Sequence, residues 1–313
     1  MDKDRQNREV FAFVPSYNHA PFIEECLNSI INQTLSPKKL LVIDDGSKDD
    51  SPRIIERILK DCPFDAELIV RENRGLCATL NQGLELSDGK YFAYIGSDDF
   101  WLPEFLAARS ALLDERTDCV LAFGNCKLID DAGAAIGCTA DNCETQAAYT
   151  QIAPADMLLS GTAPISPTVM YRRSALEKEG WNPEARLEDY ELYLKLSSIG
   201  HFAFDPAVRS AWRVHGHNTS RDRAMMLREQ LAAQSRNAGR MGLSDQRLAT
   251  ARAATTFRYA RIALQDGDRR EALRLGRTSW RGAASPTEIA RFAVGLLLPE
   301  PVKRLFRAPV KNT

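Results

Sequence analysis

The stretch LLVIDDGS, residues 40–47, decides the fold of this 313-residue chain. Leu40 to Ile43 are all apolar, as in a strand that is buried on both faces, and an acidic turn follows them directly. The same pattern of a short apolar run that ends in polar or turn-forming residues recurs at Val10–Val14 (closed by Pro15) and Tyr91–Ile95, and Ala66–Val70 is a further predicted strand with one charged residue, Glu67.

Helical patterns separate these four runs. We expect helices at about 21–33, from Ser51-Pro52 onward, where Ser51 is the N-cap and Pro52 the first helical residue, and at about 76–86. Apolar strands that alternate with helices indicate a parallel sheet covered on both faces, and right-handed crossovers make it doubly wound. The sequence therefore predicts an α/β fold with a mostly parallel sheet.

Polar residues follow three of the predicted strands at the point where each strand ends. They are Ser16-Tyr17-Asn18, Asp44-Asp45-Gly46-Ser47 and Ser97-Asp98-Asp99. Ligands of open α/β sheets bind beyond the carboxyl ends of the strands, so we expect all three groups to meet at one edge.

The second half of the chain is less regular. We expect strands at 120–123 and 168–171, an irregular or hairpin stretch at 128–150, a helix at 187–199 and extended structure at 202–214. From 222 to 305 nearly every segment is typical of helix, with breaks at 242–244, Gly267 and Ser285-Pro286.

Charge is distributed unevenly although the net charge is only −1. Residues 221–313 carry 19 Lys and Arg against 8 Asp and Glu, whereas residues 1–220 carry 22 against 34. We therefore predict two domains, the α/β domain at 1–220 and a basic helical region at 221–313.

The cysteines and the apolar runs bear on localisation. The seven cysteines are odd in number and form no Cys-X-X-Cys pair, which favours reduced thiols in a cytoplasmic protein and gives no zinc motif. The first ten residues are too polar for a signal peptide, and the apolar run 292–298 is far shorter than the roughly 20 residues that span a bilayer.

Several acidic residues could carry chemistry, and each has a simpler interpretation. Asp98 and Asp99 could hold a divalent cation on a nucleotide diphosphate, or could be two solvated residues at a turn. Asp44 and Asp45 could accept hydrogen bonds from a base or a ribose, or could form an Asx turn before Gly46.

Two features of the later half have the same ambiguity. Glu188 and Asp189 begin the helix at 187–199, where a carboxylate can cap the helix or, if ionised, act as general base toward an acceptor hydroxyl. His215, which precedes Gly216 and His217, could ligate a metal or be an ordinary loop histidine.

The order of these segments resembles the family 2 inverting glycosyltransferases with the A-type fold. The resemblance covers roughly residues 8–220, and the combination of motifs is specific although each one alone is not. The motifs are FVPSYNHAPFIEECLNSIINQT, LLVIDDGSKDDS, NRGLCATLNQGLELSDGKYFAYIGSDDFWLP, LEDYELYLKLSSIG and WRVHGHNTS.

The resemblance assigns roles to particular residues. It implies that Asp189 is the catalytic base with Glu188 as its neighbour, and that Asp98, Asp99 and His215 hold Mn²⁺ or Mg²⁺. It implies that the nucleotide contacts Pro15, Ser16, Tyr17, Asp44, Asp45, Arg74 and Asp98. One departure concerns the acidic motif, whose usual form is Asp-X-Asp. Gly96 stands at its first position here.

The function implied is metal-dependent transfer of a sugar, with inversion, from a nucleotide sugar to a saccharide or lipid-linked saccharide in cell-surface polysaccharide synthesis. UDP is the expected carrier, with GDP and dTDP as the alternatives. A catalytically inactive sugar-nucleotide-binding or scaffold protein is the alternative, which Gly96 encourages. A sugar nucleotidyltransferase or a dinucleotide-dependent oxidoreductase would need a Gly-rich phosphate loop after the first strand, where Pro15-Ser16-Tyr17-Asn18 stands.

The basic region has two interpretations. Its apolar and basic end, 289–307, could lie on the anionic inner face of the cell membrane, which would suit a lipid-linked acceptor. The region could equally be a helical cap on the acidic domain or a homodimer contact. Nucleic-acid binding is not expected because no reader motif accompanies the charge.

Overall fold

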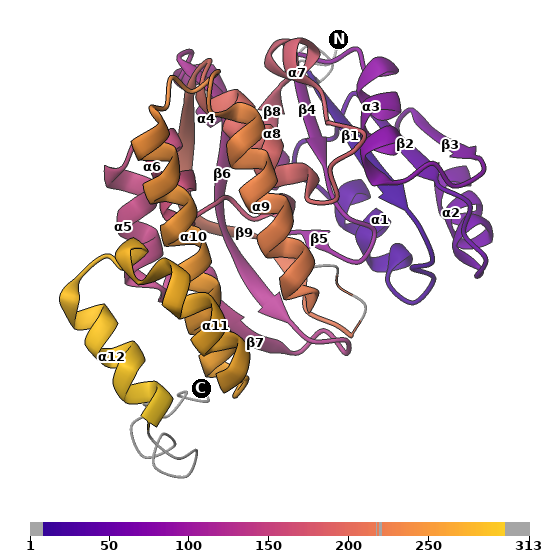
Figure 1. Ribbon diagram of the computed structural model, residues 1–313. Helices are drawn as coiled ribbons and strands as arrows, with labels where there is room; N and C mark the ends of the chain where they lie inside the picture. The colour runs from indigo at the N-terminus through magenta and orange to yellow at the C-terminus, as the bar shows by residue number, and fades with distance from the viewer. Residues whose placement is uncertain (1–8, 217, 219–220, 298–313) are drawn as a thin grey trace. The chain divides into compact units, whose positions relative to one another are not determined.

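The computed structural model describes residues 9–216, 218 and 221–297 (Figure 1). They divide into two compact units. The first contains the described residues up to 158 together with 162–221, and the second contains 159–161 together with those from 222 onward. The predicted division at residue 220 into separate domains stays a prediction.

The first unit is built on one sheet, whose strand order is β3-β2-β1-β4-β8-β6-β9-β5, with β7 paired to β6. The strands β1 to β4 are mutually parallel, while β8 is antiparallel to both of its neighbours. The strands are β1 (Val10–Ser16), β2 (Lys39–Asp44), β3 (Ala66–Val70), β4 (Tyr91–Tyr94), β5 (Phe100–Trp101), β6 (Cys119–Ile129), β7 (Ala135–Cys138), β8 (Met170–Arg172) and β9 (His201–Arg213).

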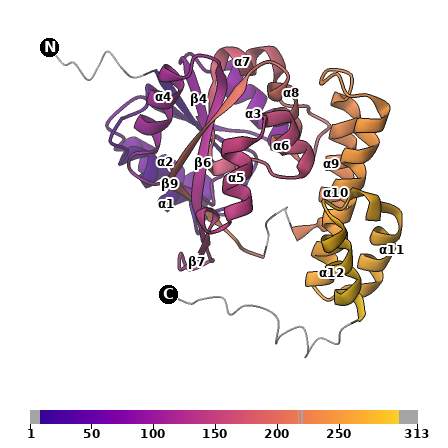
Figure 2. The ribbon, with the colours of Figure 1, turned by 90° about the vertical axis from the view of Figure 1, so that its left-hand side faces the viewer.

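Helices cover both faces of this sheet (Figure 2). One face packs against α1, α2 and α4 through a buried apolar core, and the other carries α3, α5, α7 and α8. The helices of this unit are α1 (Ile23–Ile31), α2 (Ser51–Lys60), α3 (Leu76–Glu85), α4 (Phe105–Glu115), α5 (Cys143–Gln151), α6 (Pro154–Ser160, whose last residues group with the second unit), α7 (Arg173–Glu179) and α8 (Glu188–Ser197).

The core explains why the apolar runs form central strands. Alternate residues of β1, Val10, Ala12 and Val14, pack under α1 and α2, while Phe11 and Phe13 point to the opposite face. A Cβ added to Gly83 of α3 would lie 2.7 Å from the Phe13 ring, so this glycine lets α3 approach the sheet closely. Both faces of β1 are therefore buried, as a continuously apolar strand requires.

One expected segment is wrong. We predicted that 128–150 would be irregular or a hairpin, and β6 and β7 do form a hairpin there, but 143–151 form helix α5. The side chain of Asn142 accepts a hydrogen bond from the Thr145 backbone N–H at 3.0 Å and so caps the new helix. The remaining predicted strands and helices are present with ends that differ by a few residues, except that β6 extends the predicted strand 120–123 to Ile129. Residues 298–305 of the predicted helical region lie outside the described residues.

The second unit is helical, as the sequence predicts (Figures 1 and 2). Its core joins the apolar faces of α10, α11 and α12, where Phe257 and Phe292 pack with ring centroids 5.1 Å apart. Among the described residues, no helix is both long enough and apolar enough to cross a membrane. Its helices are α9 (Arg223–Asn237), α10 (Asp245–Gln265), α11 (Arg269–Ser279) and α12 (Pro286–Leu297).

Candidate active site

The three polar groups predicted to converge do meet beyond the carboxyl ends of β1, β2 and β4. Ser16 and Asp44 are direct partners in the parallel ladder, and Ser16 Oγ donates to Asp44 Oδ2 at 3.1 Å. His19, just past the first group, places its Nδ1 2.8 Å from Ser97 Oγ of the third group. The parallel register therefore gathers segments that lie about 80 residues apart in the chain.

Asp44 is buried and holds its own turn together. Its carboxylate accepts hydrogen bonds from the Ser47 backbone N–H at 2.8 Å and from Ser47 Oγ at 2.6 Å, in addition to the bond from Ser16. The Asx-turn interpretation of this residue is thus present in the structure, whereas its contact with a nucleotide stays a prediction.

Asp45 joins the turn after β2 to the loop before α3. Its two oxygens accept the backbone N–H groups of Arg74 (2.9 Å) and Gly75 (2.8 Å), and Arg71 Nη1 lies 2.5 Å from Oδ1. The Asp45 and Arg71 side chains are only 6% and 9% exposed, so the pair is largely shielded from solvent. Asp45 therefore fixes the loop that carries Arg74.

The remaining predicted nucleotide contacts are more open. Pro15 pairs with Ile43 near the end of β1, and the chain leaves the sheet after Ser16. Tyr17 is 47% exposed and Arg74 is exposed, so both side chains remain accessible to a ligand at this edge.

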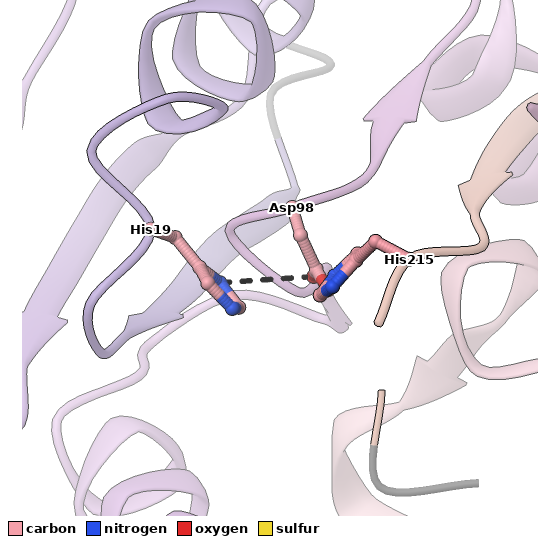
Figure 3. Close-up of side chains that lie close together, drawn as sticks. All are labelled: His19, Asp98 and His215. Atoms are coloured by element: carbon pink, nitrogen blue, oxygen red, sulfur yellow. Dashed lines mark hydrogen bonds and ion pairs between the residues drawn. The ribbon is translucent and has the colours of Figure 1, made fainter. Parts of the chain in front are cut away.

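His19, Asp98 and His215 form a compact group of possible metal ligands (Figure 3). His215 Nε2 lies 2.9 Å from Asp98 Oδ2, and His19 Nδ1 lies 3.9 Å from Asp98 Oδ1. The His215 side chain is 4% exposed, that of Asp98 is 15% and that of His19 is 26%, so the group opens to solvent on the His19 side. Our sequence prediction included Asp98 and His215 but missed His19.

Asp99 faces a different partner from Asp98. It is buried, and its Oδ1 accepts the backbone N–H of Arg213 at 2.7 Å. Burial, followed by the charge of Asp98, raises the pKa of Asp99 well above its ordinary value. Its expected role as a metal ligand stays a prediction.

Arg213, the last residue of β9, connects the parts of this site. Its Nε donates to the Asp98 carbonyl at 2.9 Å, its Nη1 donates to the Asp130 carbonyl at 3.0 Å, and its Nη2 pairs with Glu25. The guanidinium also lies 4.8 Å from the centre of the Phe22 ring. One buried cation thus ties β9, the 98–99 loop, the β6–β7 hairpin and the start of α1 into one framework.

Glu188 and Asp189 occupy the first turn of α8, where Asp189 Oδ1 accepts the Tyr190 backbone N–H at 2.6 Å. Burial raises the pKa of both carboxyl groups, and the charge of Asp189 raises that of Glu188 further. A carboxylate with a raised pKa is a better proton acceptor than one with an ordinary pKa, which suits a general base.

The groups near these carboxylates stay protonated. Burial foremost, together with the charge of Asp189, raises the pKa values of Tyr94, Tyr171 and Tyr193. Tyr94 is the last residue of β4, whose following loop carries Asp98. The negative charge at the start of α8 therefore acts on the strand that leads into the metal group.

The chain is similar to known glycosyltransferases. The chondroitin synthase of Escherichia coli is 30% identical over 215 residues, which cover 67% of this chain and 30% of that protein. A putative glycosyltransferase of Bacillus subtilis, EpsH, is 36% identical over 113 residues, 36% of this chain and 32% of that protein. The matched parts thus span about a third of these two relatives.

Solved structures share the fold. S. aureus TarS 1-349 in complex with UDP-GlcNAc has a TM-score of 0.65 at 17% identity, covering 95% of this chain and 83% of that chain. The mannosyltransferase PcManGT from Pyrobaculum calidifontis, in complex with GDP-Man and Mn²⁺, has a TM-score of 0.63 at 19% identity, covering 95% and 82%. The predicted A-type glycosyltransferase fold with C-terminal helices is confirmed.

The sequence itself places the chain among these enzymes. The family model described as glycosyl transferase family 2 matches residues 11–179, more than half of the chain. This range contains β1 to β4, the three polar groups that end strands β1, β2 and β4, and helix α7. The chain belongs to glycosyl transferase family 2.

Proposed function

We propose that this protein transfers a sugar from a nucleotide sugar, preferably a UDP-sugar, to a hydroxyl of a saccharide or lipid-linked saccharide, with inversion at the anomeric carbon. Membership of glycosyl transferase family 2 and the polar edge beyond β1, β2 and β4 support this proposal. The chondroitin synthase likeness favours a role in the synthesis of a cell-surface polysaccharide.

The position of Asp189 in the first turn of α8, where burial raises the pKa of its carboxyl, is the observation that carries the catalytic assignment. In the proposed reaction the acceptor oxygen forms a bond to C1 of the donor sugar while the bond from C1 to the diphosphate oxygen breaks. The proton of the acceptor hydroxyl passes to Asp189. The charge of Asp189 raises the pKa of the neighbouring Glu188 further, so the pair favours a single negative charge.

The residues beside the end of β4 fit a divalent cation. Asp98 provides carboxylate oxygen and His215 provides imidazole nitrogen, both of which bind Mn²⁺ or a similar ion, and their atoms are 2.9 Å apart. Asp99 is the third predicted ligand. A bound ion there supplies positive charge that stabilises the departing nucleoside diphosphate.

The donor nucleotide is assigned to the adjoining loops. Pro15, Ser16, Tyr17 and Arg74 line the edge through their backbone or exposed side chains. Asp44, Asp45 and Asp98 each retain acceptor capacity beyond the bonds they make here, because a carboxylate oxygen accepts more than one hydrogen bond. The buried Asp45 bonds to residues 74 and 75 keep this edge preformed.

Substitution of Asp189 tests the catalytic assignment. Asp189→Asn should lower transfer by at least about 100-fold, the usual contribution of a general base, while the affinity for UDP or GDP stays within twofold. The matched control Glu115→Gln, in an exposed part of α4, should change neither. Near wild-type turnover of Asp189→Asn would refute the assignment.

A panel of UDP-, GDP- and dTDP-sugars identifies the donor. Binding is measured by thermal shift of the protein with and without Mn²⁺, and activity by transfer to saccharide acceptors. Binding of a nucleotide sugar with neither transfer nor hydrolysis across the panel would favour the alternative of an inactive binding protein.

We also propose that the helical second unit contacts an anionic membrane surface near a lipid-linked acceptor. On α12, Val294 is 52% exposed and Leu297 is 82% exposed, and these apolar side chains adjoin an arginine-rich unit. The predicted segment 289–307 extends beyond residue 297, outside the described residues. The full chain should sediment with anionic vesicles and remain in the supernatant with neutral ones. A chain truncated near Thr287 should remain in the supernatant with both. Equal sedimentation of the full and the truncated chain would contradict a membrane contact through this segment.

A further inference from the structure

His19 belongs to the group formed by Asp98 and His215, although no pattern in the sequence marks it as a ligand. One potential ligand atom from each of the three residues lies within 4.8 Å of the other two. Ligand bonds of about 2.1 Å place ligand atoms up to roughly 4.2 Å apart around one ion. The separations of 2.9 and 3.9 Å to Asp98 lie within that limit, so a small side-chain movement completes the set.

The chain holds His19 where a ligand is needed. Asn18 before it has a φ of 54°, in the left-handed region, and the His19 backbone N–H donates to Ser51 Oγ at 3.1 Å. The imidazole in turn meets Ser97 Oγ at 2.8 Å through Nδ1 and lies edge-on to the ring of His215, with centroids 5.9 Å apart. The hydroxyl of Ser97 thus holds the ring in place before metal binding, and Nδ1 exchanges this bond for the ion when it acts as the ligand atom.

Gly96 explains why Asp98 turns toward the histidines. A Cβ added at Gly96 would lie 2.8 Å from Asp98 Oδ1, closer than two such atoms can approach. The carboxylate of Asp98 therefore occupies the space that a side chain at position 96 would need. In this site an imidazole from the loop after β1, rather than a second carboxylate at position 96, completes the ligands.

We propose that His19, Asp98 and His215 bind a first-row transition-metal ion before any nucleotide arrives, and that the two imidazoles select it over Mg²⁺. Mg²⁺ prefers oxygen ligands, and is usually held by one or two carboxylates together with substrate phosphates and water. Two imidazole nitrogens and one carboxylate suit transition ions such as Fe²⁺, Co²⁺ or Zn²⁺ better, and Mn²⁺, the weakest binder of the series, serves as the spectroscopic probe of the site. The proposal rests on the proposed function for the use of the ion, but not for its binding.

Electron paramagnetic resonance of Mn²⁺, titrated into the full chain without nucleotide, tests the proposal. The wild type should bind one ion per chain, and a hundredfold excess of Mg²⁺ should leave it bound. His19→Gln should bind Mn²⁺ at least about 10-fold more weakly, because it removes one of the three ligand groups. The control His201→Gln removes an exposed imidazole at the other end of β9 and should match the wild type.

Thermal unfolding in the absence of metal checks that each variant is folded, since the backbone bond to Ser51 does not depend on the His19 side chain. Equal Mn²⁺ affinity in wild type and His19→Gln would overturn the proposal, as would release of the ion by Mg²⁺. Mn²⁺ uptake that requires UDP or GDP would also overturn it, yet would leave the proposed function intact. Mn²⁺ binding without affinity for any nucleotide sugar would instead count against the proposed function alone.

Discussion

The backbone N–H of Arg213 donates to the Asp99 carboxylate at 2.7 Å across 114 residues of chain. This bond fixes the end of β9 against the loop that follows β4. The Arg213 side chain strengthens the same junction through the Asp98 carbonyl and Glu25. Arg213 and His215, on either side of Val214, therefore serve the same site. Arg213 supports it, and His215 is a possible metal ligand.

Removal of the Arg213 side chain should weaken both the fold and the site. Arg213→Met leaves the half-buried carbonyls of Asp98 and Asp130 without this donor, which should cost about 1–3 kcal/mol of the free energy of unfolding. Urea unfolding measures this loss, and Mn²⁺ affinity should fall in the same variant. The control Arg57→Met breaks an exposed pair with Glu24 and should change stability by less than about 1 kcal/mol. Similar losses in both variants would contradict the supporting role.

Asp189 should cost the protein stability at neutral pH. Its carboxyl has a raised pKa in the folded state, so over the window between the ordinary range near pH 4 and that raised value the folded chain binds more protons than the unfolded chain. Stability therefore falls as pH rises through this window. Asp189→Asn should raise the melting temperature at pH 8 but leave it nearly unchanged at pH 4. A lower melting temperature of Asp189→Asn than of the wild type at pH 8 would show that burial does not disfavour the ionised carboxylate.

The same pKa sets the acidic limb of catalysis. Transfer needs ionised Asp189, so kcat should fall as pH drops below a midpoint that lies above the ordinary aspartate range near pH 4. The neighbouring Cys77 has a pKa raised to about 12 by burial, and the three tyrosines are raised as well, so none of them produces this limb. A midpoint near pH 4 would place the base elsewhere.

A side chain at Gly96 should displace the Asp98 carboxylate. Gly96→Ala brings a Cβ to 2.8 Å from Asp98 Oδ1, so Asp98 must rotate and the affinity for Mn²⁺ should fall about 10-fold or more. Calorimetric titration with Mn²⁺ measures the change. Gly239→Ala, which meets no atom within 4 Å, is the control and should bind the ion normally.

The buried cysteines should resist thiol reagents while the chain is folded. Burial raises the pKa values of Cys26 and Cys126, the latter to about 12, so little of either thiol is ionised at neutral pH. A chromogenic disulfide reagent should label the partly buried Cys62 and Cys138 before Cys26 and Cys126, and should label the two buried thiols only after unfolding. Rapid labelling of Cys26 would show that the loops around Gly96 open readily.

The strands were predictable because their signal is local. Leu40–Ile43 and Val10–Val14 are apolar on both faces and end in polar residues, and parallel pairing then requires Ser16 and Asp44 to meet. Helix α5 was missed because its amphipathic pattern is weak and its start depends on a single capping residue, Asn142.

The site was predictable only in part. Asp98 and His215 stand out through their neighbours in the sequence, whereas His19 stands one residue past the Ser16–Asn18 group in an ordinary loop pattern. Its position beside Asp98 follows from the left-handed Asn18 and from Ser97, which are properties of the folded chain. The different orientations of Asp98 and Asp99 likewise depend on Arg213, more than a hundred residues away.

The separation of His19, Asp98 and His215 along the chain makes any ion they share a cross-link. Such an ion would close two long loops, one from the first strand to the fourth and one from there to the last residues of the first unit. A chain that has formed only its first strands has no complete chelate, so uptake of the ion would mark the moment at which β9 docks. Depletion of the metal would then lower the amount of correctly folded protein as well as its turnover.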